Sequence, residues 1–199
     1  MRIVLGLGNP GARYEGTRHN LGFRVVDELA GRGGVVFRRR DEITDLAWTV
    51  EARIGGQDTV LAKPRTFMNR SGRAALALLR RYDQTPAGLL VIHDDADLEL
   101  GRLRIRPNGR AGGHNGLRSL IAALGSEEFP RIKLGVRGEG RGEADLAEYV
   151  LEDFDAGERS TASALVALGA DAVEAVLDQG VERAMNLLNG RSVDAGPPD

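Results

Sequence analysis

Cysteine is absent from this sequence of 199 residues. Without it, the chain has no disulfide, no catalytic thiolate and no zinc site built on cysteine. Histidine is scarce too, with three residues, and aromatic residues make up 5% of the chain. No apolar run approaches the ~20 residues that a membrane span needs. The chain also opens on Ile3-Val4-Leu5 without the pattern of a signal peptide, so we expect a cytoplasmic protein that does not contact membranes.

Net charge is almost absent as well, at −2, but the charges are unevenly distributed. Residues 1–138 carry a net charge of +8, whereas residues 139–199 carry −10. A basic body of this kind permits a phosphate-binding face, although a solvated surface with an arbitrary charge bias gives the same counts. Of the 27 basic residues, 25 are arginine, a side chain suited to bidentate phosphate contacts.

Apolar periodicity predicts alternating strands and helices. Strands are expected at residues 2–8, 46–54, 59–63, 88–92, 102–106 and 131–136. Helices are expected at 20–32, 71–82, 115–124, 156–177 and 181–188, with a flexible loop at 138–143. This alternation indicates a single α/β domain over residues 1–190, in which helices flank a central mixed β-sheet, followed by a flexible tail at 191–199.

Three glycine-flanked turns each carry an asparagine, namely Asn9, Asn69 and Asn115. Each alone is explained as a turn residue, but neutral amides also donate to an oxyanion without competing for a proton. His19 lies at the end of a strand-to-helix loop, where α/β proteins place functional residues, and its ordinary pKa suits a general base. The segment Val91–Asp97 supplies carboxylates at the end of an apolar run. The combination predicts an enzyme that cleaves an ester or a related bond with neither metal nor cysteine.

Other motifs give weaker signals. Gly6-x-Gly8-x-x-Gly11 matches a dinucleotide fingerprint, but Pro10 and the residues after it do not begin the helix that this fingerprint needs. The segment His93–Asp97 could ligate a metal through alternate residues on one strand face, yet no other histidine has ligand spacing. Neither Ser71 nor Ser119 lies in a nucleophile elbow, so water is the expected nucleophile.

Taken together, these segments resemble the bacterial-type peptidyl-tRNA hydrolase family over about residues 1–190. The matching strings, in the order and spacing of the family, are Gly6–Gly11, Tyr14, Thr17–Asn20, Gly22-Phe23, Thr66–Gly72, His93–Leu98, Gly112–Leu117 and Tyr149–Leu151. The resemblance implies an α/β fold and hydrolysis of the ester that joins a peptide to the 3′ ribose of a tRNA, which recycles peptidyl-tRNA released from ribosomes. The partner that it implies is peptidyl-tRNA, bound at the acceptor stem and 3′ end. We also expect a monomer that needs no cofactor.

The resemblance implies a role for each site residue as well. His19 is the catalytic base, and Asp94 orients it. The substrate-binding residues are Asn9, Tyr14, Phe67, Asn69 and Asn115. The basic clamp on the tRNA 5′-phosphate falls on Arg106 and Lys133, with Arg104 nearby. His114 flanks the site without a proton-transfer role.

One departure from the family and two alternatives stay open. Where the family commonly continues Gly-Ile-Gly-Arg-Pro, this chain has Gly135-Val136-Arg137-Gly138-Glu139-Gly140, so this loop is expected to be more flexible and more polar. The chain could also be an RNA-binding relative that has lost hydrolysis, although the retained histidine, aspartate and asparagines argue against it. A metal-dependent hydrolase centred on His93–Asp97 would instead be sensitive to a chelator.

Overall fold

Six β-strands form one mixed sheet at the centre of the computed structural model, which describes residues 1–37, 45–138 and 146–193. The strands are β1 (Arg2–Gly6), β2 (Ala47–Ile54), β3 (Gln57–Pro64), β4 (Leu89–Glu99), β5 (Leu103–Arg106) and β6 (Arg131–Arg137). Their order across the sheet is β2-β3-β1-β4-β6-β5. The four inner strands are parallel, and the edge strands β2 and β5 are antiparallel to their neighbours. The mixed sheet expected from the sequence is confirmed.

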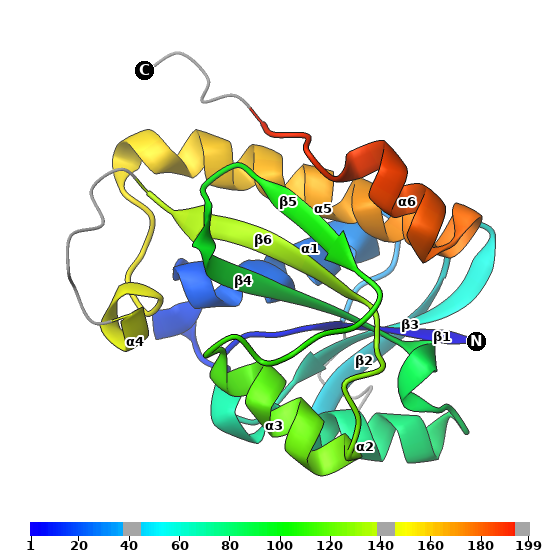
Figure 1. Ribbon diagram of the computed structural model, residues 1–199. Helices are drawn as coiled ribbons and strands as arrows, with labels where there is room; N and C mark the ends of the chain where they lie inside the picture. The colour runs from blue at the N-terminus through cyan, green and yellow to red at the C-terminus, as the bar shows by residue number, and fades with distance from the viewer. Residues whose placement is uncertain (38–44, 139–145, 194–199) are drawn as a thin grey trace.

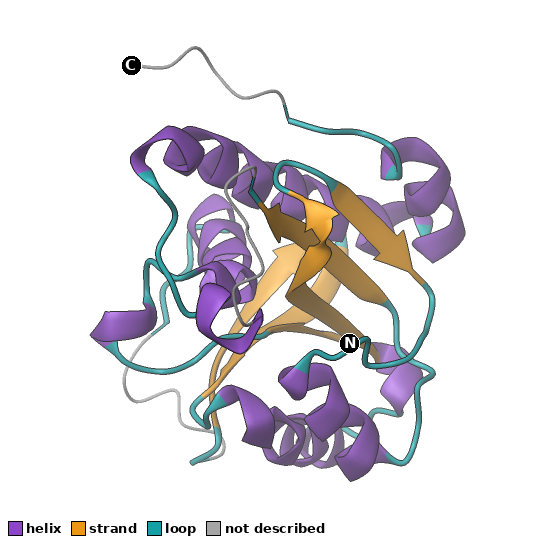
Figure 2. Ribbon diagram, turned by 60° about the vertical axis from the view of Figure 1, so that its left-hand side comes forward, coloured by secondary structure: helices purple, strands orange, loops and turns teal. Residues whose placement is uncertain are grey.

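Helices cover both faces of this sheet. They are α1 (Leu21–Arg32), α2 (Ser71–Arg81), α3 (Asn115–Leu124), α4 (Leu146–Tyr149), α5 (Arg159–Gln179) and α6 (Val181–Leu188). Figure 1 shows α5 and α6 above the sheet and α2 and α3 below it, and Figure 2 shows the same layers from another side. Along the central strands, Val4 and Leu90 pack into the core with α1, α5 and α6, while Ile3 and Val91 pack into the core with α2 and α3. Burial on both faces explains why these strands begin as continuous apolar runs.

The expectation that no segment approaches a membrane span needs correction at α5. With the turn before it, the helical stretch Ala156–Gln179 reaches a mean hydropathy of 1.4, which is long and apolar enough to span a membrane. However, 56% of that apolar window is buried inside the protein. Its buried residues, among them Leu165 and Val173, belong to the core that also contains α1 and the sheet. Packing in the core therefore accounts for the apolar character of α5.

β4 departs most from the expected elements. The apolar run predicts a strand that ends at Ile92, but β4 continues to Glu99 because His93, Asp94 and Asp95 pair with β6. Hydrogen bonding to a neighbouring strand extends β4 through polar residues, and hydropathy alone does not detect this. β1 is shorter than expected and ends at Gly6. No sequence pattern predicts the short helix α4.

The predicted loop at 138–143 and the predicted tail at 191–199 lie mostly outside the described residues. Two contacts hold the last described residues next to the start of β5. Ser192 forms a β-bridge with Arg102, and the Val193 N–H donates to the Gly101 carbonyl oxygen at 2.9 Å.

Two glycines set the distances between the elements that carry the predicted site residues. A Cβ at Gly22, in the first turn of α1, would lie 2.5 Å from the Ile92 carbonyl oxygen, so only glycine lets α1 approach β4 this closely. A Cβ at Gly72, in the first turn of α2, would lie 2.1 Å from the Ser119 carbonyl oxygen of α3. The first contact brings the loop before α1 to the end of β4. The second brings the starts of α2 and α3 together.

Candidate active site

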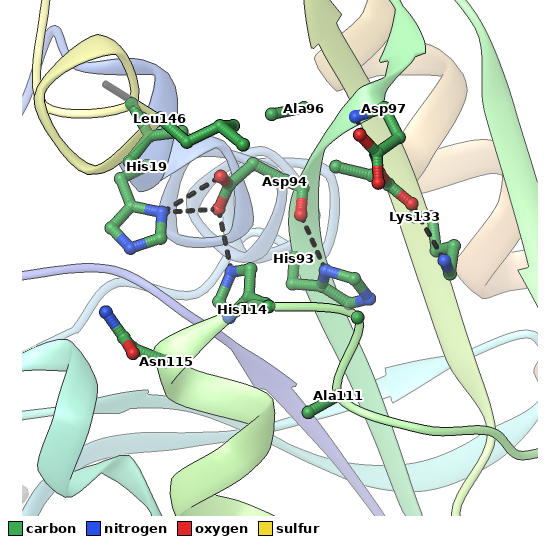
Figure 3. A pocket seen from close by; sticks show the side chains of 14 residues that line it. His19, His93, Asp94, Ala96, Asp97, Ala111, His114, Asn115, Lys133 and Leu146 are labelled. Atoms are coloured by element: carbon green, nitrogen blue, oxygen red, sulfur yellow. Dashed lines mark hydrogen bonds and ion pairs between the residues drawn. The ribbon is translucent and has the colours of Figure 1, made fainter.

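His19 and Asp94 meet at the carboxyl edge of the parallel strands (Figure 3). His19 lies in the 3-10 helix η2 (Arg18–Asn20) before α1, and Asp94 lies on β4. The His19 Nδ1 atom is 2.8 and 2.9 Å from the two carboxylate oxygens of Asp94, and both side chains are buried. Because a carboxylate only accepts, Nδ1 carries the proton of the neutral ring, and Nε2 keeps a lone pair. Figure 3 shows Nε2 pointing away from Asp94, toward Asn115.

The charge of Asp94 controls the proton affinity of His19. Burial of the imidazole disfavours its protonation, but the Coulombic attraction and the hydrogen bond of Asp94 outweigh burial and raise the pKa of His19 above its usual 6.5. Burial also opposes the charged form of Asp94, yet His19 and His114 together hold the pKa of this carboxyl far below its usual range. Asp94 is therefore an anion at physiological pH, and His19 is a stronger base than a free histidine.

His114 is a second hydrogen-bond partner of the Asp94 carboxylate. It caps the N-terminus of α3, where its Nδ1 accepts the backbone N–H groups of Gly116 and Leu117 at 3.1 and 3.3 Å. Since Nδ1 must accept from these donors, the ring proton is on Nε2, which donates to Asp94 Oδ1 at 3.0 Å. His114 is thereby held as one neutral tautomer between the start of a helix and the carboxylate. This role supports its exclusion from proton transfer.

The third histidine, His93, is also buried. Its Nδ1 donates to the carbonyl oxygen of Asp94 at 2.7 Å, and its ring meets the His114 ring edge to face with centroids 4.9 Å apart. Burial and the neighbouring His114 lower the pKa of His93 to about 3, so the ring stays neutral. His93 therefore supports the backbone and the ring next to the His19–Asp94 pair.

A metal ion is the alternative use of this cluster. Within the described part of the chain, the one group with ligand atoms close enough is His19, Asp94 and His114, whose atoms lie within 4.8 Å of one another. This donor set does not fit a cation, because His114 Nδ1 accepts backbone N–H groups and a metal on Nε2 would require an imidazolate. The segment His93–Asp97 does not form such a group, and Asp95 is paired with Lys133. The hydrogen bonds favour a site without metal.

The three asparagines lie around one cavity of about 210 Å³, which His19 also lines. Asn9 is buried, and its Oδ1 accepts the Met68 N–H at 2.8 Å. Asn69, in the short 3-10 helix before α2, and Asn115, the first residue of α3, are both exposed. Asn115 Oδ1 accepts a hydrogen bond from Arg118 at 3.0 Å. All three NH₂ groups lack a hydrogen-bond partner among the described residues. They are therefore available to a substrate.

Phe67 and Tyr14 form an aromatic pair beside this cavity. Their ring centroids are 6.3 Å apart, and the rings meet edge to face at 81°. Phe67 is 51% exposed and lines the cavity, whereas Tyr14 is not among the lining residues and accepts a hydrogen bond from Arg13. Phe67 thus lines the cavity itself, whereas Tyr14 packs against Phe67 and does not line the cavity.

A segment from the C-terminal third covers the cleft. Ala147, Val150 and Leu151 line the cavity next to His19. The backbone N–H of His19 donates to the Val150 carbonyl oxygen at 2.8 Å, and the backbone N–H of Arg18 donates to the Glu152 carbonyl oxygen at 3.0 Å. Residues 146–152 therefore hold the loop that carries His19.

Arg18 strengthens this link with its side chain. The guanidinium is 3% exposed and lies 4.4 Å from the ring centroid of Tyr149 and 5.2 Å from that of Phe154. It also makes an ion pair with Glu158 at 2.6 Å. A buried arginine of this kind requires such partners, because an unpaired charge would be costly to desolvate.

The three basic residues expected to meet tRNA share one face of the β5–β6 pair. In register, Arg104 lies opposite Lys133 and Arg106 lies opposite Arg131, while the alternate residues of β5 enter the core below α5 and α6. Lys133 pairs with Asp95 at 2.7 Å and lines a second cavity of about 150 Å³ that also reaches His19. Arg104 and Arg106 have no ion pair in the parts of the chain that the structure describes.

Sequence reasoning missed several residues that support the site. Asn20 accepts the Asn9 N–H at 2.7 Å and donates to the Asn9 carbonyl oxygen at 3.0 Å. Its position directly after His19 in a matching string was the available signal. Tyr149–Leu151 also lies in a matching string, but the contacts of residues 150–158 with Arg18 and His19 had no signal in the sequence, because they join segments far apart in the chain.

Among the described residues, neither of the two serines considered as a nucleophile is placed to attack a substrate. Ser119 Oγ accepts the Gly72 N–H at 3.0 Å, and Ser71 is fully buried. The fold is of the α/β class, and the site is that of a hydrolase with a histidine–aspartate pair at its centre.

Comparison with known proteins identifies the family. A family model described as peptidyl-tRNA hydrolase matches residues 3–196, and the chain belongs to this family. It is 50% identical to the peptidyl-tRNA hydrolase of Chloroflexus aurantiacus over 190 residues, which cover 95% of this chain and 99% of that protein. It is 47% identical to that of Mycobacterium tuberculosis over 184 residues, with 92% and 95% covered.

Solved structures agree with this assignment. The crystal structure of peptidyl-tRNA hydrolase from Acinetobacter baumannii has a TM-score of 0.86 and 31% identity, and the match covers 96% of each chain. A complex of peptidyl-tRNA hydrolase with N-propanol has a TM-score of 0.87 and 31% identity, with 98% of this chain and 97% of that chain covered. The chain is thus an enzyme, a hydrolase acting on peptidyl-tRNA, and the resemblance found in the sequence is confirmed.

Proposed function

We propose that this enzyme cleaves the ester between a peptide and the 3′ ribose of tRNA by general-base catalysis through His19. Asp94 accepts the Nδ1–H of His19 and orients Nε2 toward the cavity. There Nε2 takes a proton from a water molecule while the water oxygen attacks the ester carbonyl carbon. The Asp94 anion stabilises the resulting imidazolium, and the same attraction raises the pKa of His19. The bond between the carbonyl carbon and the ribose 3′ oxygen then breaks, and the imidazolium gives the proton to the leaving 3′ oxygen.

The amide groups around the cavity have the second role in this mechanism. Asn9, Asn69 and Asn115 would donate hydrogen bonds to the peptide backbone and to the oxyanion that forms on the carbonyl oxygen. Phe67, supported by Tyr14, would contact the substrate at the exposed side of the cavity. An ester is more labile than an amide, so a positioned base and neutral donors are sufficient.

The basic face of β5 and β6 would hold the tRNA. Arg106 and Lys133 bind the 5′-phosphate in this proposal, and Arg104 contributes a further phosphate contact. Arginine suits this task because its guanidinium donates to two phosphate oxygens at once. Their common face in the strand register supports the assignment.

The observation that carries the mechanism is the contact of His19 Nδ1 with both oxygens of Asp94. Turnover of N-acetyl-aminoacyl-tRNA, measured with and without EDTA, tests it against the metal alternative. We expect the same rate in both conditions. Loss of activity in EDTA that Zn²⁺ or Mg²⁺ restores would replace the mechanism by a metal-dependent one.

We also propose that the enzyme works as a monomer in the cytoplasm, where its substrate arises, and that residues 1–190 suffice for activity. Light scattering at the concentration of the activity assay tests the monomeric state. A dimer whose dissociation abolished turnover would contradict it.

A further inference from the structure

We propose that Asp95 makes the tRNA clamp selective for a terminal phosphate monoester. Its ion pair with Lys133 prevents the phosphodiesters of the RNA backbone from binding this lysine. The inference rests on the proposed role of Lys133 as a phosphate contact. It assigns to Asp95 a role in substrate specificity that is separate from the role of its neighbour Asp94 in orienting His19.

The first observation is that Lys133 is already paired. Its Nζ lies 2.7 Å from Asp95 Oδ2, and the two side chains are 27% and 15% exposed. The carboxylate is itself held in place, because Asp95 Oδ1 accepts the Asp97 N–H at 3.0 Å. Both residues line the cavity of about 150 Å³ that reaches His19. A ligand of Lys133 must therefore compete with a fixed negative charge.

The second observation is that the other clamp residues differ. Arg104 lies directly opposite Lys133 in the strand register, and Arg106 lies two residues further along the same face. Neither has an ion pair among residues 1–37, 45–138 and 146–193. The Asp95 carboxylate is therefore paired with Lys133, whereas Arg104 and Arg106 are free to bind any phosphate.

The charge of the ligand decides the competition. A backbone phosphodiester carries one negative charge, the same as the carboxylate that it would oppose. A terminal phosphate monoester carries about −1.5 to −2 at pH 7 and has three acceptor oxygens. To bind Lys133, a phosphate must displace the Asp95 carboxylate, and the cost of breaking that ion pair is the same for every ligand. The Coulomb attraction of the ligand to the ammonium rises with the charge of the ligand, so the monoester outcompetes Asp95 and the diester does not.

A comparison of two substrates tests this inference. One is N-acetyl-aminoacyl-tRNA with its 5′-phosphate, and the other is the same tRNA dephosphorylated to a 5′-hydroxyl. The readout is the ratio of their kcat/KM values for the wild type and for Asp95→Asn, which keeps the shape but removes the charge. We expect the ratio to fall roughly 3- to 10-fold in the variant, because the freed lysine raises kcat/KM for the 5′-hydroxyl substrate.

Two further variants separate the explanations. Asp97→Asn removes the same charge from an exposed carboxylate on the same strand, so it should change both substrates alike and leave the ratio as it is. Lys133→Ala should abolish the preference for the 5′-phosphate that Lys133 contributes. If Lys133→Ala abolishes the preference but Asp95→Asn keeps the full ratio, the clamp stands and the role of Asp95 is refuted. If the wild type shows no preference, the clamp itself is wrong, and the inference is overturned with it.

Discussion

The Asp94 end of the cleft and the β5–β6 end differ in how their charged groups are buried and paired. Around Asp94, which is 2% exposed, two histidine N–H groups donate to a buried carboxylate. On the β5–β6 face, Arg104 is exposed, and neither it nor Arg106 has an ion pair within the described residues. Buried charges interact strongly and are hardly screened, so geometry controls them, whereas exposed charges act by their number and are screened by salt. Changes at the first end should affect chemistry and pH dependence, and changes at the second should affect substrate capture and salt dependence.

The largest expected effect is that of His19→Ala. Removal of a positioned general base typically costs ~10²–10⁴-fold in rate, so kcat for N-acetyl-aminoacyl-tRNA should fall by this factor. Circular dichroism and thermal melting should show that the fold is retained, and tRNA binding should persist. A folded variant with wild-type turnover would refute the role of His19.

Asp94→Asn should reduce kcat less than His19→Ala does, because the base remains but loses its orientation. The pH profile gives the sharper signature. Asp94 raises the pKa of His19, so loss of its charge should lower that pKa. Since His19 must be neutral to act, the acid limb of kcat/KM should then move to lower pH. A limb that stays in place or moves to higher pH would show that another group controls it.

Gly72→Ala should destabilise the protein and also misplace Asn69 and Asn115, because a Cβ there would overlap the Ser119 carbonyl oxygen. Overpacking of this kind costs about 1–3 kcal/mol of unfolding free energy, measured by denaturant titration. The matched control is Gly31→Ala in α1, where a Cβ meets nothing within 4 Å. It should leave the stability unchanged or raise it by about 0.5–1 kcal/mol. Equal losses at both positions would mean that close packing of α2 on α3 is not the cause.

Arg106→Ala and Lys133→Ala should have the smallest effect on chemistry and a distinct effect on salt dependence. Each should remove about one phosphate contact, so the slope of log KM against log salt should become shallower by ~0.7–0.9. We expect kcat to be largely retained, because the clamp binds ground and transition states alike. Hydrolysis of an acyl-aminoacyl ester of a single 3′ nucleotide is the control and should not change. An equal loss on that short substrate would show that these residues support the fold or the active site instead.

Local patterns predicted what depends on local structure. The helix at residues 115–124 has the predicted bounds, because a glycine turn precedes it and apolar residues follow at helical spacing. The strand predicted at residues 102–106 is likewise found as β5, which begins one residue later, at Leu103. In both cases, the signal lies within one element.

Contacts that depend on strand register could not be predicted in this way. The Lys133–Asp95 pair joins residues 38 positions apart, and it exists because β4 continues beyond its apolar run and pairs with β6. The double role of His114, as the cap of α3 and as a donor to Asp94, requires the end of β4 to meet the start of α3. The family resemblance pointed to His19 and Asp94, but these supporting contacts became visible only in three dimensions.

The link between Arg18 and residues far along the chain has a consequence for newly made protein. The Arg18 side chain donates to the Asp153 carbonyl oxygen, 135 residues further on, and to Glu158. A growing chain of this enzyme is itself a peptide esterified to tRNA while it is being synthesised. The loop that carries His19 cannot gain these contacts until residues 150–158 have left the ribosome. Incomplete chains that end before this segment therefore lack the contacts that hold the His19 loop in place.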